Sequence, residues 1–322
     1  MKNILIKLGA MTLFGFCCVA NSQTNYPNKP IKIVVPYGVG GSTDVLTRIV
    51  AQKLSEKIGV AVFVDNKAGA NTMIGTELVA NSPNDGYTLL AATSGNAANL
   101  ALLGLKAQIF PKSFVPIVGI ASTPNAIAVS NNSPYKSLQE LINAAKKNPD
   151  GLSYAHAGVG SLQHLVGEQL EIAANIKLVD VPYKGGGPAA ADVLAGQVPI
   201  LVSGLTASIS FINSGRLRAL AVTSEKRSPS LPNTPTVAES GYPGFNSIFW
   251  IGLYAPAGTP AYVVQKINTE VNEILKRPDV VSQMFQQAAE PFGGTPQSLE
   301  VFVKNDIENF MKIIKAANIK LD

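Results

Sequence analysis

The pattern of apolar and polar positions predicts a strand, a glycine turn and a helix in immediate succession near the start of the chain. Residues 31–37 are apolar and rich in β-branched side chains, which is typical of a buried strand in a parallel sheet. The turn 38–41 (Gly-Val-Gly-Gly) follows, Ser42 or Thr43 is placed to cap a helix, and apolar residues then recur at helical spacing until Gly59. The free amides of such a helix N-terminus suit an anion, although glycine serves equally in a tight turn without a ligand.

The same arrangement recurs further along the chain. Two more predicted strands, at 152–155 and 178–182, each lead through a glycine turn into a helix, and these turns are 156–161 and 183–187. The alternation predicts an α/β fold in which the ends of parallel strands collect on one edge. Another predicted strand ends in small polar residues, Thr93 to Asn96, which suit either a ligand or the cap of the next helix.

The order of elements predicts two lobes. A second lobe is predicted to begin after Pro124 and to end near Phe245, because a loop with several prolines then leads back through a strand at 249–254. Amphipathic helices at 261–276 and 296–317 are predicted to pack against the first lobe. The chain would cross between the lobes twice, which makes a hinge. The predicted division is residues 1–22 as a leader, 23–124 with 246–322 as lobe 1, and 125–245 as lobe 2.

The first 22 residues predict an export signal and hence a periplasmic protein. They combine two lysines, a short apolar run at 8–19 and small residues that allow a cut after Ala20 or Ser22. No stretch reaches the roughly 20 apolar residues that a membrane-spanning helix needs. Cleavage would remove both cysteines, so the mature chain would have no disulfide, no thiolate metal site and no cysteine nucleophile.

Charge and histidine content narrow the possible functions. The chain has 26 basic and 21 acidic residues without a long basic run, so nucleic acid is not the predicted partner. The two histidines, His156 and His164, are too few for a histidine-rich metal cluster, and we expect no metal and no cofactor. With 46% hydrophobic residues, the chain has enough apolar side chains to build well-packed cores.

Several long stretches together resemble one family. They resemble the Bug family, the periplasmic solute-binding proteins of tripartite tricarboxylate transporters, and the similarity runs in order over essentially the whole mature chain. The resemblance implies a two-lobed Venus-flytrap fold of the periplasmic-binding-protein (type II-like) kind, a small carboxylate held between the lobes, a membrane transporter as partner and a monomer. The stretches are YPNKPIKIVVPYGVGGSTDVLTR, VDNKAGANTMIGTELVANSPNDGYTLL, SYAHAGVGSLQHL, VPYKGGGPAAADVLAGQVP, GRLRALAVTSEKRSPSLPNTPTVAESGYPGF and WIGLYAPAGTP.

The resemblance also implies where the carboxylate binds. In the family, the loop after the first strand and the glycine loop of the second lobe hold it through backbone amides, small hydroxyls and ordered waters. Ser203 matches a position where ligand-specific side chains occur. The other matching residues are Tyr37, Gly38, Val39, Gly40, Gly41 and Ser42, then His156, Ala157, Gly158, Gly160 and Ser161, with Thr93 and Ser94 alongside.

Histidine at position 156 departs from the family, which often has serine there. We expect His156 to donate a hydrogen bond to the anion, and the alternative is a structural hydrogen bond to a neighbouring loop. His164 is expected to be packed inside the second lobe.

An exported α/β hydrolase is the main alternative function, with Ser161 and His164 as its catalytic pair. Their spacing is that of neighbours on one helix, and the sequence has no GxSxG motif, so we expect binding rather than hydrolysis. A nucleotide site is disfavoured as well, because the first glycine turn matches neither GxGxxG nor a P-loop. A structural or adhesion protein would seldom place three glycine turns at the ends of strands.

Overall fold

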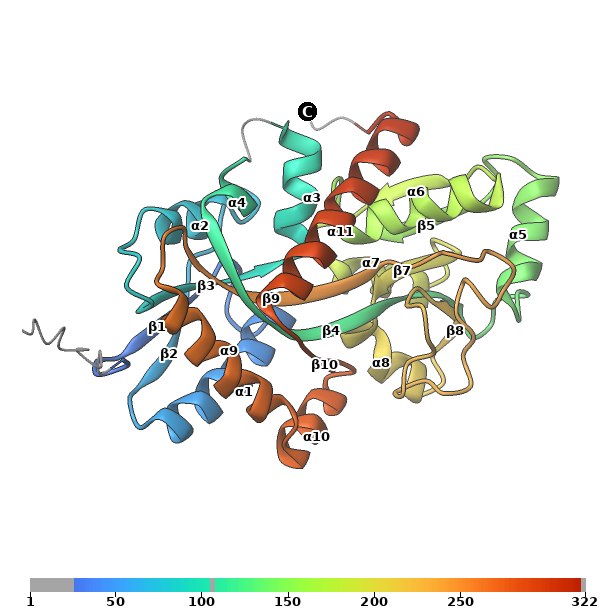
Figure 1. Cartoon of the computed structure of the whole chain (residues 1–322). Coiled ribbons are helices and arrows are strands. Elements are labelled where there is room, and N and C mark those ends of the chain that lie inside the picture. The colour runs from blue at the N-terminus through green and yellow to red at the C-terminus, as the bar shows by residue number, and fades with distance from the viewer. Residues whose placement is uncertain (1–25, 105–107, 320–322) are drawn as a thin grey trace, which may run out of the picture.

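The computed structural model describes residues 26–104 and 108–319, so the predicted export leader lies outside the described residues. These residues form an α/β fold in which two groups of strands meet along one very long strand (Figure 1). None of the helices in the described ranges has the length and apolar character required to cross a membrane. The predicted α/β fold class is confirmed.

The first group of strands has a parallel core. Strand β1 lies between β2 and β3 and runs parallel to both, with Ile33 opposite Val64 on one side and Leu89 on the other. Ile33 and Leu89 are fully buried, as expected for a central parallel strand. The antiparallel strands β9, β4 and β10 complete this group. The bounds are β1 (Ile31–Val35), β2 (Val62–Asn66), β3 (Thr88–Thr93), β4 (Phe114–Ser130), β9 (Ile248–Pro256) and β10 (Glu290–Gly293).

The second group is built on the other half of β4. Strands β7 and β8 pair antiparallel with β4, while β5 runs parallel to β7 and to β6. The predicted strand at 152–155 is therefore present one residue later, and it leads into the second glycine turn as expected. The bounds are β5 (Ser153–His156), β6 (Val179–Pro182), β7 (Ile200–Gly204) and β8 (Leu217–Val222).

Strand β4 connects the two groups without a break. Its first part, up to Pro124, pairs with β9, and its last part, from Asn125, pairs with β7 and β8. The sequence pattern predicted a short strand at 126–129 and missed residues 114–124, because Pro116 and Gly119 interrupt the apolar run and the pairing is bulged there. The chain returns to the first group through β9. The exact division into lobes at residues 124 and 246 stays a prediction.

Eleven helices of the described ranges cover these strands. Helix α1 begins at Ser42, but Gly41 is its N-cap and no side chain caps it, so the predicted cap by Ser42 or Thr43 was wrong. Gly59 ends the helix in the left-handed conformation, with φ of 74°. Its apolar side packs with α9 over the first group of strands. The bounds are α1 (Ser42–Ile58), α2 (Met73–Ala80), α3 (Ser94–Leu103), α4 (Ile109–Lys112), α5 (Leu138–Lys147), α6 (Leu162–Ala174), α7 (Gly186–Leu194), α8 (Leu205–Asn213), α9 (Ala261–Leu275), α10 (Pro278–Gln286) and α11 (Pro296–Ala317).

The C-terminal helix α11 contacts both groups. It lies across the molecule in Figure 1 and packs on α3, β4 and α6. Buried apolar residues recur along it every three or four positions, including Val303, Ile307 and Phe310, so one continuous stripe faces the core. The prediction that this helix packs against the first lobe therefore described only part of its contacts.

Candidate functional site

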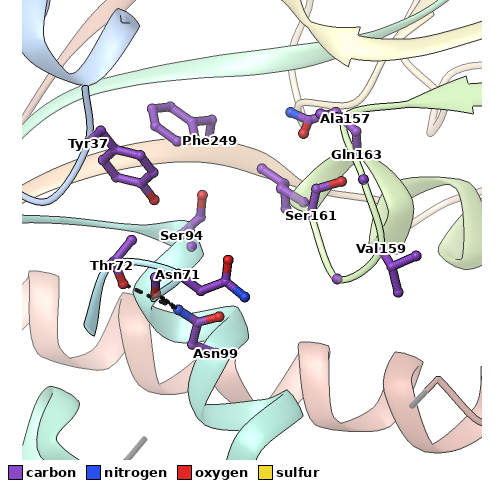
Figure 2. A pocket seen from close by; sticks show the side chains of 14 residues that line it. Tyr37, Asn71, Thr72, Ser94, Asn99, Ala157, Val159, Ser161, Gln163 and Phe249 are labelled. Atoms are coloured by element: carbon purple, nitrogen blue, oxygen red, sulfur yellow. Dashed lines mark hydrogen bonds between the residues drawn. The ribbon is translucent and has the colours of Figure 1, made fainter. Parts of the chain in front are cut away.

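A cavity of about 280 Å³ lies where the ends of the strands from the two groups face each other (Figure 2). Phe249 of β9 lies beside it, and the wall formed by the first group faces the wall formed by the second. Among the described residues, the fourteen that line the cavity carry no charged side chain. They are Tyr37, Asn71, Thr72, Ser94, Gly95, Asn99, Ala157, Gly158, Val159, Gly160, Ser161, Leu162, Gln163 and Phe249.

The carboxyl ends of β1 and β3 place hydroxyl groups on the first wall. The Tyr37 hydroxyl lies 2.7 Å from the Thr93 Oγ1, and burial raises the pKa of Tyr37. Thr93 is fully buried and caps α3 by accepting the Gly95 amide at 3.1 Å, so it holds Tyr37 in place rather than lining the cavity. The Ser94 Oγ is buried and has no hydrogen-bond partner among the described residues. Ser94 lines the cavity, so its hydroxyl is available to a ligand.

A strained turn before α2 completes the first wall. Ala70, Asn71 and Thr72 all have positive φ, at 45°, 47° and 75°, and such a conformation is costly for a β-branched residue like Thr72. Two asparagines of α3 hold the turn: Asn96 Nδ2 donates to Thr72 Oγ1 at 3.1 Å, and Asn99 Nδ2 donates to the Asn71 carbonyl. The sequence analysis did not assign the turn or Asn99 to the site, and it named Asn96 only as part of the polar end of a strand. Asn71, two residues after Gly69, was a signal for the left-handed conformation. It gave no signal that the turn lines a cavity.

The first glycine turn does not line the cavity with its backbone. Residues 38–41 are exposed, and of the predicted stretch Tyr37 to Ser42 only its two end residues line a pocket. The Gly40 amide donates to Asp44 Oδ2 at 2.9 Å, and Arg48 Nε and Asn66 Nδ2 hold the other carboxylate oxygen. Burial alone would raise the pKa of Asp44, but these hydrogen bonds outweigh it and lower the pKa. The turn is thus closed by a carboxylate of its own helix.

The second glycine turn lines the cavity from Ala157 to Ser161, which is all of it except His156. Ser161 caps α6 through its hydroxyl, which accepts the His164 amide at 3.2 Å. The Gly160 amide donates to the His164 Nδ1 at 3.1 Å, and Gly158 and Gly160 have φ of 125° and 76°, which glycine adopts without strain. The structure thus brings Ala157, Gly158, Gly160 and Ser161 together opposite Ser94.

His156 lies outside the cavity. Its side chain is fully buried, and its ring stacks on that of His164 with 4.7 Å between ring centres. Burial, helped by His164, lowers the pKa of His156 to about 4. We expected this ring to donate to a bound anion, but it lies on the other side of the loop from the cavity. The alternation of side chains along β5 directs the ring beneath α6, toward Asp180.

A smaller pocket of about 160 Å³ adjoins the cavity and shares three lining residues with it. Ser42 and Ser203 line this second space, and the Ser203 hydroxyl donates to the Gly204 carbonyl at 3.2 Å. Gln163 lines both spaces and donates to Asn125 Oδ1 of β4 at 3.0 Å. Gln163 and Phe249 were missed by the sequence analysis, because neither lies in a glycine turn or carries a distinctive motif.

Comparison with known proteins decides the family. A model of the family described as "Tripartite tricarboxylate transporter family receptor" matches residues 46–319, which is most of the chain. The chain belongs to this receptor family. The protein BugT of Bordetella pertussis is 33% identical over 323 residues and covers 100% of this chain and 99% of its own length. The resemblance to the Bug family is confirmed.

Solved structures of similar receptors have the same fold. BugD, a periplasmic binding protein, is 36% identical with a TM-score of 0.76, and the match covers 92% of this receptor and 99% of BugD. Rpa4515 of R. palustris, solved with adipate, is 35% identical with a TM-score of 0.80 over 92% and 99%. MatC of Rhodopseudomonas palustris, solved with bound malate, is 27% identical with a TM-score of 0.73 over 90% and 100%. The predicted periplasmic-binding-protein fold is confirmed.

The hydrolase alternative finds no support in this receptor. The Ser161 hydroxyl accepts a backbone amide, and the nearby Nδ1 of His164 accepts the Gly160 amide instead of the serine proton. A nucleophile and its base need a hydrogen bond between them, with a third group that orients the base. The family is one of solute-binding receptors, and its function is the capture of a solute.

Proposed function

We propose that this receptor captures a small dicarboxylate in the cavity of Figure 2 and passes it unchanged to the membrane subunits of a tripartite transporter. The observation that carries the proposal is the chemistry of the cavity wall. It consists of hydroxyls, side-chain amides and the backbone of residues 157–161, and no charged side chain of the described residues lines it. Such a wall holds an anion through hydrogen bonds from neutral donors.

The second wall supplies the stronger anion site. Residues 157–161 lie at the N-terminus of α6, a helix of 13 residues, where the helix dipole favours negative charge. The amides of Gly158, Gly160 and Ser161 have partners within this half, so the dipole and the remaining amides of the turn supply the attraction. No acidic residue in the first turn of α6 opposes this dipole. One carboxylate of the ligand is therefore assigned to this turn.

The first wall supplies a second set of donors on the opposite side. Ser94 has a buried hydroxyl without a partner among the described residues, and the side chains of Asn71 and Asn99 lie beside it. A ligand with a carboxylate at each end satisfies both walls at once. Adipate and malate, which are bound by two relatives of known structure, have this form. This similarity supports the dicarboxylate class for the present receptor.

Binding is proposed to close the two halves on the ligand. The halves follow the predicted division, residues 23–124 with 246–322 and residues 125–245, joined by β4 and by the return into β9. Because each wall belongs to a different half, the contacts to both carboxylates exist together only in the closed form, and these contacts stabilise it. The closed form would then be the one that the transporter recognises.

The experiment compares two serines in adjoining spaces. The Ser94→Ala variant removes the free hydroxyl of the cavity, and Ser203→Ala removes a hydroxyl of the smaller pocket that already has a backbone partner. We expect Ser94→Ala to weaken adipate or malate about 10- to 100-fold in calorimetry, since a hydrogen bond to a charged group contributes about 1.5–3 kcal/mol. Ser203→Ala should bind as the unchanged protein does.

Two outcomes would refute the proposal. One is an unchanged affinity in Ser94→Ala together with a loss in Ser203→Ala, which would move the ligand to the smaller pocket. The other is the absence of binding to any member of a panel of dicarboxylates. Recovery of the ligand after incubation, followed by NMR, tests the statement that it is released unchanged. A new product would show an enzyme.

A further inference from the structure

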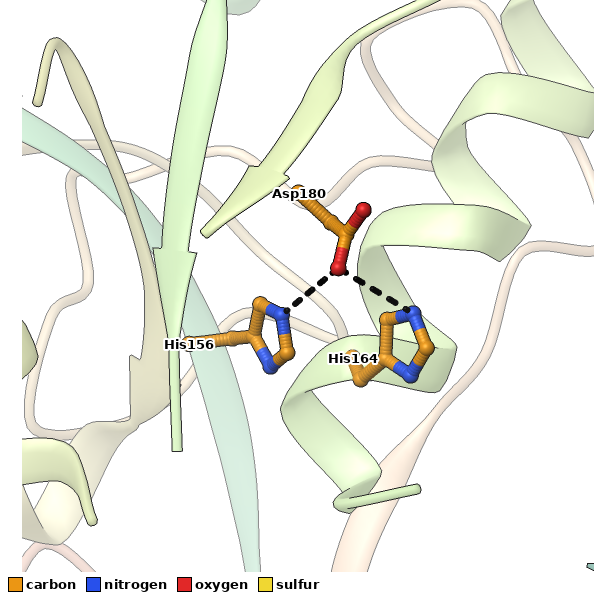
Figure 3. Close-up of side chains that lie close together, drawn as sticks. All are labelled: His156, His164 and Asp180. Atoms are coloured by element: carbon orange, nitrogen blue, oxygen red, sulfur yellow. Dashed lines mark ion pairs between the residues drawn. The ribbon is translucent and has the colours of Figure 1, made fainter. Parts of the chain in front are cut away.

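A cluster of three side chains lies behind the second glycine turn, away from the cavity (Figure 3). His156 ends β5, His164 lies in the first turns of α6, and Asp180 projects from β6. The Nε2 atoms of the two histidines face the same oxygen, Asp180 Oδ2, at 3.6 and 4.0 Å. One turn along α6, Glu168 Oε1 lies 3.6 Å from His164 Nε2. Three groups of metal-ligand type thus converge, with Glu168 beside one of them.

The distances between these atoms are those of ligands around one ion. At 3.6–4.0 Å, the histidine nitrogens are too far from Asp180 for a hydrogen bond, which needs about 2.7–3.2 Å. Ligands bound tetrahedrally to zinc at about 2.0–2.2 Å lie roughly 3.3–3.6 Å from one another. The donor atoms of His156, His164 and Asp180 all lie within 4.8 Å of one another, so small side-chain shifts suffice to reach that geometry.

One tautomer of His156 leaves its Nε2 ready to bind a cation. The Nδ1 lies 3.1 Å from the Gly158 carbonyl and 3.3 Å from the Gly158 amide, so it has a partner in either tautomer; when its N–H donates to the carbonyl, Nε2 keeps a lone pair. This Nε2 is buried and has no hydrogen-bond partner among the described residues, and it faces the Asp180 carboxylate. In that tautomer two electron-rich atoms face each other, and a positive ion between them removes the repulsion.

We propose that His156, His164 and Asp180 form a binding site for a transition-metal ion, with Zn²⁺ as the best match. Two imidazoles and a carboxylate suit zinc, whereas Mg²⁺ and Ca²⁺ prefer oxygen ligands. Glu168 lies near His164 alone, so the site has three protein ligands. Asp180 is 45% exposed, which gives the ion a route from solvent to the two buried rings. The sequence analysis excluded a histidine-rich cluster and did not consider two histidines combined with carboxylates.

The site is connected to the ligand cavity through one amide. The Gly160 amide donates to His164 Nδ1, so in the metal-free protein the proton of this ring is on Nε2. A metal bound at Nε2 requires that proton to move to Nδ1, where it ends the hydrogen bond from Gly160. Gly160 lines the cavity, so metal binding changes the partner of an amide on the cavity wall. This consequence provides a readout at a single residue.

Calorimetry with ZnCl₂ tests the site in the untagged chain after treatment with a chelator. We expect one ion per chain, and a loss of about tenfold or more in affinity in His156→Gln, His164→Gln and Asp180→Asn. Asp150→Asn is the matched control, because Asp150 is an exposed aspartate elsewhere in the same half. MgCl₂ should give no binding. Asp180 is partly exposed, so Asp180→Asn tests the site even if a histidine variant fails to fold.

Two results would overturn the proposal. The first is zinc binding that is equal in the unchanged protein and in Asp180→Asn, or no binding at all. A second test follows the ¹⁵N NMR signal of the Gly160 amide. We expect this signal to move when zinc is added to the unchanged protein and to stay in place in Asp180→Asn. A Gly160 signal that does not respond to saturating zinc contradicts the proposed ligation by His164. Neither test depends on binding of a dicarboxylate, so failure here leaves the proposed function standing.

Discussion

The two glycine turns of this receptor have similar sequences but hold their amides in opposite ways. Both join a strand to a helix, as Gly-Val-Gly-Gly-Ser in one half and Gly-Val-Gly-Ser in the other. In the first, the Gly40 amide donates to the Asp44 carboxylate. In the second, the Gly160 amide donates to the uncharged ring of His164. One turn is therefore closed by a negative charge, and the other by a neutral group.

This difference explains which turn faces the cavity. A carboxylate at the start of α1 already occupies the place that a bound anion would take, and its charge repels another anion. The first turn accordingly contributes side chains, through Tyr37 and Ser42, rather than amides. The second turn has no such charge and lines the cavity with its backbone. Similar sequence motifs thus differ in function because of one side chain three residues into a helix.

Replacing a glycine by valine in each turn should give the largest contrast. Gly40 and Gly160 both have positive φ, at 84° and 76°, so valine strains each turn by about 1–3 kcal/mol. We expect Gly160→Val to weaken dicarboxylate binding by more than about tenfold, because this strain distorts the cavity wall. Gly40→Val should destabilise the protein similarly and bind nearly normally. Equal losses of affinity in calorimetry would show that both turns hold the ligand.

The buried ring of His156, behind the second turn, should make the free energy of unfolding fall in mild acid. The pKa of His156 is lowered from 6.5 to about 4, so its contribution is complete above pH 6.5 and is lost as the pH falls toward 4, where the unfolded chain takes up the proton first. The loss amounts to roughly 3 kcal/mol. Urea unfolding in the presence of a chelator should show this slope between pH 6.5 and 4, and His156→Gln should flatten it. If the unchanged protein and His156→Gln had the same slope, His156 would be protonated freely in the folded state.

The carboxylate of the first turn should contribute to stability without affecting the ligand. Asn at position 44 keeps the shape but loses the charge that accepts hydrogen bonds from Gly40, Arg48 and Asn66. We expect Asp44→Asn to lower the free energy of unfolding by about 1–3 kcal/mol and to leave dicarboxylate affinity unchanged. The lowered pKa of Asp44 means that this stability is present above pH 3.8 and is lost as the pH falls further.

A control separates this effect from a general loss of negative charge. Asp65 of β2 pairs with Lys67 at a partly exposed position, and Asp65→Asn should change the free energy of unfolding by less than about 1 kcal/mol. If Asp44→Asn were equally mild, the carboxylate would not be what closes the first turn.

The sequence predicted the units of the fold because each carries its own local signals. The apolar run of β1, the start of α1 at Ser42 and the left-handed Gly59 all depend on one segment, and the structure has all three, although Gly41 rather than a serine or threonine side chain takes the cap position. Both glycine turns were placed at the ligand by the resemblance to the Bug family, and only the second lines the cavity with its backbone. The first turn was not read correctly, because the effect of Asp44 depends on Arg48 beside it and on Asn66 from another strand.

The residues of the site that the sequence did not predict are positioned by long-range contacts. Asp180 reaches the two histidines because β5 and β6 pair with Tyr154 opposite Asp180, and a shift of one residue would turn the carboxylate to the other face. The strained turn at Asn71 depends in the same way on Asn96 and Asn99, which come from another helix. Such pairings follow from how elements meet and leave no pattern along the chain.

The valines of the two turns offer the finest test of the comparison. Val39 is 76% exposed and lies away from the cavity, while Val159 is 48% exposed and lines it. Removal of two methyl groups in Val159→Ala should weaken the ligand only about two- to fivefold, because a side chain that is half exposed buries little further area on binding. Val39→Ala should have no measurable effect in the same titration. A larger loss in Val39→Ala than in Val159→Ala would mean that the first turn folds over the ligand when the halves close, so that its outward position belongs to the open form alone.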